Sequence, residues 1–214
     1  GPRKAITLLA DEVTTPFQPL LYVGFCGKVY VIDINAQKRL PVELQVSPDD
    51  TFGVSLALHR GLLIASSGGV VTAFQTSDQS EAWFHQFGHE TGYLFMTSLQ
   101  VVRHDGRDIV LVGSNGYLLA VELKSGKELW CTSLPRGGYA FVSSLIYHNV
   151  LYVASNGKLW SLNLENGEVI WSMLISELGN HSPCLLSTEG RNLTSSDTPI
   201  IPAQERMPSF SLFR

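Results

Sequence analysis

Residues 113–130 read GSNGYLLAVELKSGKELW, and residues 154–171 read ASNGKLWSLNLENGEVIW. Both stretches place a Gly after an apolar run, alternate apolar and polar residues, turn at a second Gly and end on Trp. Two related stretches precede them, GFCGKVYVIDINAQKRLP at 24–41 and SSGGVVTAFQTSDQSEAW at 66–83. The chain therefore contains four copies of one unit, and repeats of this length are typical of propellers, solenoids and arrays.

Two landmarks fix the alignment of the four copies. The first is a glycine, found at Gly27, Gly69, Gly116 and Gly157, with spacings of 42, 47 and 41 residues. The second is a tryptophan 14 residues later, found at Trp83, Trp130 and Trp171. Copy one has Pro41 at that position and is degenerate there. We interpret these seven residues as structural repeat positions.

Each copy predicts four β-strands. Asn115-Gly116 and Asn156-Gly157 stand between apolar runs, which is typical of type I′ hairpin turns because both central residues need a positive φ. A second turn follows at 124–126 and 165–167, and a further strand is expected upstream of each apolar run. No window keeps a helical apolar period for more than about one turn. The sequence therefore predicts an all-β propeller with about four four-stranded blades.

We expect the propeller to occupy residues 1–187, followed by an extended tail containing Pro and Ser at 188–214. The predicted blade cores lie near 20–46, 51–87, 93–134 and 139–175, with a closing strand at 181–187. Pairing 181–187 with blade one closes a four-bladed ring and removes open sheet edges. Two alternatives stay open: a homodimer sharing one eight-bladed ring, and a chain that forms part of a larger seven- or eight-bladed propeller.

The pattern at 116–130 and 157–171 resembles the PQQ-type repeat of quinoprotein alcohol dehydrogenase-like β-propellers and of outer-membrane assembly lipoproteins. The resemblance covers roughly residues 20–187 and implies that the repeat Trp packs between neighbouring blades. It also implies that an enzyme of this family carries about eight blades, a bound calcium, a catalytic Asp and two adjacent cysteines. Here Cys26, Cys131 and Cys184 are scattered. We therefore expect no cofactor and no enzymatic activity.

Composition excludes several classes of partner. The net charge is −4 and no run of Lys or Arg occurs, which argues against nucleic-acid binding. No stretch approaches the roughly 20 apolar residues of a membrane-spanning helix. The three cysteines are an odd number without metal or redox spacing, and the N-terminal residues lack the layout of a signal peptide. These features favour a cytoplasmic location.

The histidines do not predict a metal site. His59, His104 and His148 fall at equivalent turns of separate blades, so repeat symmetry keeps them too far apart to share one ion. His85 and His89 are four residues apart in a non-helical segment, where only Glu90 offers a further ligand and zinc needs about four.

The loops between blades offer better binding candidates. Such loops gather at one mouth of a propeller's channel, and loops on a rigid scaffold concentrate function. Tyr93, Arg136, Tyr139 and His181 combine an apolar body with a polar tip, and aromatic and Arg residues mark binding hot spots. We therefore expect a non-enzymatic binding or assembly module that recognises a protein or peptide. Carbohydrate binding, as in lectin-like propellers, is the alternative, and a quinoprotein-type oxidoreductase is less supported.

Overall fold

A computed structural model describes residues 7–11 of the chain as backbone, and residues 20–48, 53–86, 97–135, 137, 142–147 and 150–178 with side chains. Across these residues the secondary structure consists of strands, turns and one short 3₁₀ helix, η1 (Ser176–Leu178). No helix in this part of the chain is long and apolar enough to cross a membrane.

The strands form four sheets, here called blades one to four. Blade one contains β1 (Thr7–Asp11), β2 (Leu20–Phe25), β3 (Lys28–Asp33) and β4 (Lys38–Gln45). Blade two contains β5 (Ser55–His59), β6 (Leu62–Ser67), β7 (Val70–Gln75) and β8 (Glu81–Gln86). Blade three contains β9 (Ser98–His104), β10 (Arg107–Ser114), β11 (Tyr117–Glu122) and β12 (Glu128–Ser133). Blade four contains β13 (Ser143–Tyr147), β14 (Val150–Ser155), β15 (Lys158–Leu162) and β16 (Val169–Leu174).

Every blade is an antiparallel meander in sequence order. The turn between its second and third strands has the predicted type I′ character: φ is 48° at Asn115 and 74° at Gly116, and 48° at Asn156 and 71° at Gly157. The third and fourth strands of each blade pair with one register irregularity, just before the second turn. The predicted all-β architecture of four-stranded blades is confirmed.

The inner strand of blade one is β1. Thr7–Asp11 pairs with β2, with Thr7 opposite Gly24 and Asp11 opposite Leu20. The pairing of a closing strand at 181–187 with blade one stays a prediction. Residues 181–187 themselves lie outside the described part of the chain.

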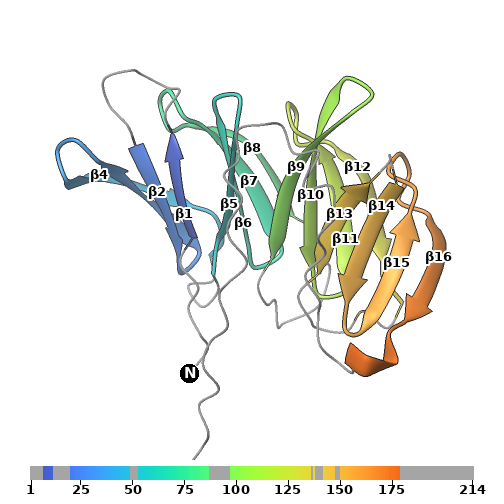
Figure 1. Ribbon diagram of the computed structural model, residues 1–214. Helices are drawn as coiled ribbons and strands as arrows, with labels where there is room; N and C mark the ends of the chain where they lie inside the picture. The colour runs from blue at the N-terminus through green and yellow to red at the C-terminus, as the bar shows by residue number, and fades with distance from the viewer. Residues whose placement is uncertain are drawn as a thin grey trace, which may run out of the picture.

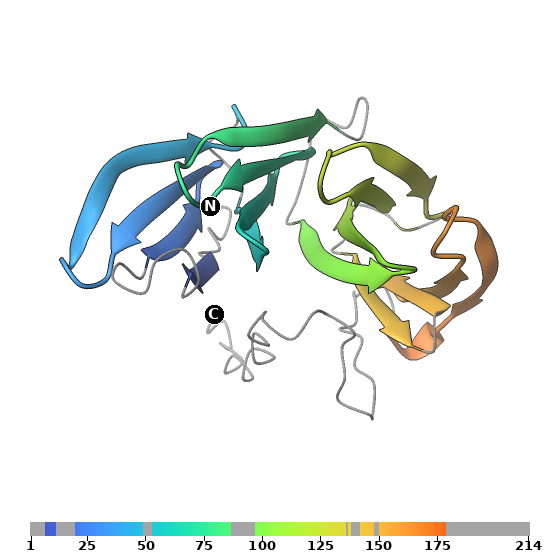
Figure 2. The same cartoon turned by 90° about the horizontal axis from the view of Figure 1, so that it is seen from above.

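The blades stand side by side in an arc, with blade one at one end and blade four at the other (Figures 1 and 2). Their inner strands are neighbours, because β1 contacts β5, β5 contacts β9 and β9 contacts β13. The outer strands β4, β8, β12 and β16 form the convex side in the view from above (Figure 2).

The hydrophobic core is divided among the joints between consecutive blades. Tyr22 and Val29 pack with Leu63 between blades one and two. Ile64 and Val71 pack with Leu119 between blades two and three. A third cluster, between blades three and four, includes Leu111 and Leu118 of blade three and Leu151 and Trp160 of blade four. Burying each such side chain contributes roughly 1.5–3 kcal/mol, so these joints hold the arc together. Among the described residues no cluster joins blade four to blade one.

Candidate functional site

The four residues predicted to line the channel mouth, Tyr93, Arg136, Tyr139 and His181, all lie outside the described residues. Their role as binding residues stays a prediction. The seven repeat positions are described: the four glycines occupy the turn between the second and third strands of each blade, and the three tryptophans lie on outer strands. The contacts of the three tryptophans define the candidate site described below.

Trp83 and Trp130 each cross a joint and bind the next blade. Trp83 on β8 donates its indole N–H to the carbonyl oxygen of Leu123 at 2.7 Å, and Trp130 on β12 donates to that of Leu164 at 2.9 Å. The two residues are only 8% and 7% exposed. Because a buried indole N–H needs an acceptor, this carbonyl is part of the socket for each ring.

The floor of each socket is a glycine in the second turn of the next blade. A Cβ on Gly126 would lie 2.5 Å from Cδ2 of Trp83, and one on Gly167 would lie 2.5 Å from Cε3 of Trp130. Both distances are far shorter than a carbon–carbon contact, so any side chain there would push the ring out. The Thr132 hydroxyl also donates to the Gly167 carbonyl at 2.7 Å, which adds a polar contact to the joint between blades three and four.

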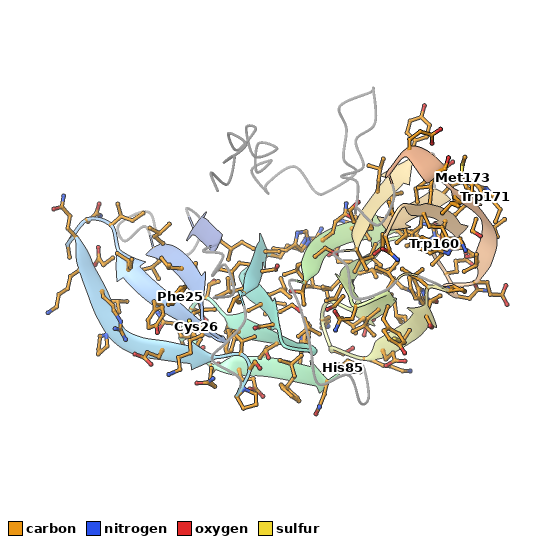
Figure 3. All side chains as sticks on the ribbon, turned by 90° about the horizontal axis from the view of Figure 1, so that it is seen from below. Phe25, Cys26, His85, Trp160, Trp171 and Met173 are labelled. Atoms are coloured by element: carbon orange, nitrogen blue, oxygen red, sulfur yellow. The ribbon has the colours of Figure 1, made fainter. Side chains whose placement is uncertain are left out.

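Trp171 has the same place in its repeat and a different environment. It is 42% exposed, since the described residues include no blade beyond blade four to cover it. Its ring lies beside that of Tyr152 in its own sheet, with ring centroids 6.1 Å apart and planes tilted by 58°. Figure 3 shows Trp171 and Met173 together at the far end of the arc, with Trp160 nearer to blade three.

The whole of β16 is exposed, unlike the other strands of blade four. Its large apolar residues are Val169, Ile170, Trp171, Met173 and Leu174. By register, Trp171 lies opposite Ser161 and Met173 opposite Leu159, and Ser161 lies opposite Tyr152. Residues opposite each other share one face of a sheet. We call the side of the sheet that carries Trp171 and Met173, turned away from blade three, the open face of blade four. Ile170 instead borders the pocket at the joint with blade three.

The outer strands of the other blades are more polar at equivalent positions. β8 has Glu81, His85 and Gln86 where β16 has Val169, Met173 and Leu174, and β12 has Glu128, Thr132 and Ser133 there. Large exposed apolar side chains of this kind are typical of interaction surfaces. The repeat position of Trp171 predicts the same buried role as that of Trp130, whereas Trp171 is exposed in the structure.

Histidines and carboxylates pair across the joints, which the sequence analysis did not predict. His59 at the end of β5 places Nε2 3.3 Å from Oδ2 of Asp108 on β10, and Arg60 contacts the same oxygen at 2.8 Å. His85 on β8 lies 3.1 Å from Glu128 on β12. These residues are more than 40 positions apart in the sequence, so only the packing of neighbouring blades brings them together. His89 and Glu90, considered with His85 as ligands, lie outside the described residues.

One group at the joint of blades three and four has the composition of a metal site. Ligand atoms of His104, Asp105 and Glu165 lie within 4.8 Å of one another. They border an open pocket of about 320 Å³ that is also lined by Leu162, Asn163 and Ile170. Imidazole and carboxylate suit a divalent ion such as zinc, but both carboxylates are exposed and His104 lies 3.6 Å from Asp105 itself. This geometry describes a solvated ion pair equally well.

Two other groups have altered acidities. Partial burial, together with the charge of Glu128, raises the pKa of the Cys131 thiol on β12 to about 11. Hydrogen bonds from the hydroxyl and backbone N–H of Ser80 lower the pKa of Asp78 in the second turn of blade two. Neither arrangement resembles an activated nucleophile or a general base, because the thiol is held protonated and the carboxylate is exposed.

Comparison with known proteins places this architecture in a family. The sequence model of the family described as outer membrane protein assembly factor BamB matches residues 20–141 and, in an overlapping second alignment, residues 53–184. The chain belongs to this family of PQQ-type repeat propellers. The resemblance inferred from the repeat sequence is thereby confirmed. A search of curated protein sequences gives no match.

Three solved structures illustrate the shared fold. BamB from Moraxella catarrhalis is similar with a TM-score of 0.50 and 13% identity over 72% of this chain and 49% of that one. A chain of the mitotic checkpoint complex has a TM-score of 0.57 and 15% identity over 82% and 52%. Quinohemoprotein alcohol dehydrogenase ADHIIG from Pseudomonas putida HK5 has a TM-score of 0.50 and 16% identity over 72% and 32%. The 214 residues thus match about half, or less, of the length of each.

Proposed function

We propose that this chain is a non-enzymatic propeller module that binds a protein partner, and that the open face of blade four is a surface on which the partner is held. The observation that carries the proposal is the exposure of Trp171 within a strand that is apolar at three positions, Val169, Met173 and Leu174, where β8 and β12 are polar. Trp, Tyr and Met are enriched in protein interfaces, and a large ring contributes much of the energy of a contact.

The names of two similar proteins agree with an assembly role. The matching family is described as an assembly factor, and the mitotic checkpoint complex is itself a multiprotein assembly. The mouth of the channel, with Tyr93, Arg136, Tyr139 and His181, is the second surface on which we expect a protein or peptide to bind. Substitutions at the channel mouth and on blade four, tested separately, show which of the two surfaces binds the partner.

Site-specific photo-crosslinking tests the proposal. A photoreactive phenylalanine analogue replaces Met173 on β16 in the full chain, and the control carries it in place of Phe84 on β8. Both positions are exposed, at 50% and 51%. We expect a defined protein adduct from position 173 that is absent from position 84 and is lost when Trp171→Ala is added.

Adducts of equal yield at both positions, or none at either, would contradict the blade-four surface. Four separate alanine variants, at Tyr93, Arg136, Tyr139 and His181, complete the design. A partner that is lost through these variants while position 173 gives no adduct binds at the channel mouth instead.

A further inference from the structure

We infer that the tip of the β9–β10 hairpin and the second turn of blade four together form a binding site for a divalent transition-metal ion such as zinc. Its protein ligands are His104, Asp105 and Glu165, whose ligand atoms lie within 4.8 Å of one another. The bound ion ties blade three to blade four across their joint. This site is separate from the open face of blade four, so the inference does not depend on the proposed function.

The β9–β10 hairpin reaches the next blade because it is longer than its counterparts. Blades two, three and four share one equivalent pair between their first two strands, seven residues before the repeat glycine: His59 with Leu62, Val102 with Ile109, and Tyr147 with Val150. In blade three alone among these, the ladder continues beyond this pair, with Arg103 opposite Asp108 and His104 opposite Arg107. The added length places the tip of the hairpin beside the second turn of blade four.

The two sides of this hairpin differ in how their carboxylates are neutralised. Toward blade two, the Asp108 carboxylate pairs with an imidazole and a guanidinium, those of His59 and Arg60. Toward blade four, Asp105 and Glu165 bring two carboxylates to a single imidazole, and within the described ranges no Lys or Arg forms an ion pair with either. The negative charge of this group is the charge that a divalent cation compensates.

The imidazole of His104 distinguishes this group from a solvated ion pair. Its Nε2 atom is buried and has no hydrogen-bond partner, whereas the nitrogen of a solvated pair contacts water. Nε2 lies 3.6 Å from Oδ2 of Asp105, which is too long for a hydrogen bond. Two ligands of a tetrahedral zinc ion, each bound at about 2.0–2.2 Å, lie roughly 3.4 Å apart. Because buried polar atoms in proteins nearly always have a partner, an ion held between these two atoms accounts for the arrangement.

The pocket beside the ligands has room for the ion and a water molecule. Its volume is about 320 Å³, and its walls include Leu162 and Ile170 as well as His104 and Glu165. The backbone N–H of Glu165 donates to Oδ1 of Asn163 at 2.8 Å, which holds the turn that carries the carboxylate. Three protein ligands and one water complete a four-coordinate zinc shell. Imidazole among the ligands favours zinc over magnesium or calcium, which prefer oxygen ligands alone.

Isothermal titration calorimetry with Zn²⁺ tests the inference in the full chain, with Cys26, Cys131 and Cys184 replaced by serine so that thiolates do not compete. We expect one ion per chain and a melting temperature that rises with added Zn²⁺, because the ion binds the folded state. His104→Ala and Glu165→Gln should each weaken zinc binding by about tenfold or more, at least the loss that follows removal of a group that only orients a ligand. In EDTA, Glu165→Gln should melt like the parent chain, since Glu165 is exposed.

His85→Ala is the matched control. His85 also pairs with a carboxylate across a joint, at 3.1 Å from Glu128, but these two residues form a hydrogen-bonded pair without a third ligand. Its removal should leave the zinc affinity unchanged, as should Trp171→Ala on the open face. The absence of zinc binding, zinc binding that persists in both His104→Ala and Glu165→Gln, or an equal loss in His85→Ala would each overturn the inference.

Discussion

Gly167 illustrates how one missing side chain decides whether two blades pack. It has a φ of 73°, and a Cβ there would lie 2.5 Å from the ring of Trp130. Gly106, in the turn between β9 and β10, has nearly the same φ of 75° and nothing within 4 Å of an added Cβ. Comparing substitutions at Gly106 and Gly167 therefore distinguishes the cost of backbone strain from the cost of a steric clash.

We predict that Gly106→Ala destabilises the protein by about 1–2 kcal/mol, the cost of the left-handed conformation for alanine. Gly167→Ala adds overpacking of roughly 1–3 kcal/mol to the same strain. Urea unfolding followed by far-ultraviolet circular dichroism measures both. Equal losses would mean that the Trp130 ring moves aside freely and that the socket is not selective.

Cys131 gives a prediction about chemical reactivity. Its pKa is raised to about 11, so near neutral pH it carries roughly a hundredfold less thiolate than an ordinary protein thiol of pKa 9.0. In a Cys26→Ser, Cys184→Ser background, alkylation by iodoacetamide should be slow at pH 8 and half-maximal near pH 11. Because the pKa of Cys131 is higher in the folded state than in the unfolded state, the unfolded state loses the thiol proton at lower pH. The free energy of unfolding therefore falls as pH rises from about 9 to 11. Half-maximal alkylation near pH 9 would contradict the desolvation of the thiol.

At the scale of strands, β12 and β16 show one repeat sequence in two surroundings. Trp130 is enclosed by the turn of the next blade, whereas Trp171 meets no next blade among the described residues. The difference lies in the neighbouring element and not in the strand itself.

We therefore predict that Trp130→Ala costs roughly 3–5 kcal/mol of unfolding free energy, because it empties a socket and leaves the Leu164 carbonyl without its donor. Trp171→Ala, its matched control, should cost less than about 1 kcal/mol in the isolated chain. Chemical denaturation of the two variants measures the difference. Similar costs would show that Trp171 is already packed against something.

The strands also show how far the sequence carries the prediction. Gly116 and Trp130 recur at fixed spacing, so the four-stranded unit and its turns are predictable from the pattern alone. The sequence pattern does not predict that β1 belongs to blade one, since the segment with Pro16 and Pro19 interrupts the apolar pattern before β2. The exposure of Trp171 and the pairing of His59 with Asp108 could not be predicted, because each depends on what the adjacent blade supplies.

At the scale of the whole molecule, the four described blades form an arc (Figure 2), and the exposed apolar residues of β16 lie at one end of it. We expect no response to the cofactor of the quinoprotein members. A ligand that binds only the folded state raises the free energy of unfolding, by about 2.7 kcal/mol at a hundredfold excess over Kd, and so raises the melting temperature. Adding PQQ with calcium should therefore leave Tm unchanged in differential scanning fluorimetry. A rise of several degrees would contradict the non-enzymatic proposal.

The open face of blade four is the central claim, and tryptophan fluorescence tests it most directly. The chain has four tryptophans, of which Trp83, Trp130 and Trp160 are buried and Trp171 is exposed. Acrylamide quenching of the wild-type chain should reveal one accessible population of emission, and Trp171→Phe should remove that population and leave the protected emission unchanged. If Trp171 is as protected from acrylamide as the other three in the wild-type chain, the face is covered and the account is contradicted.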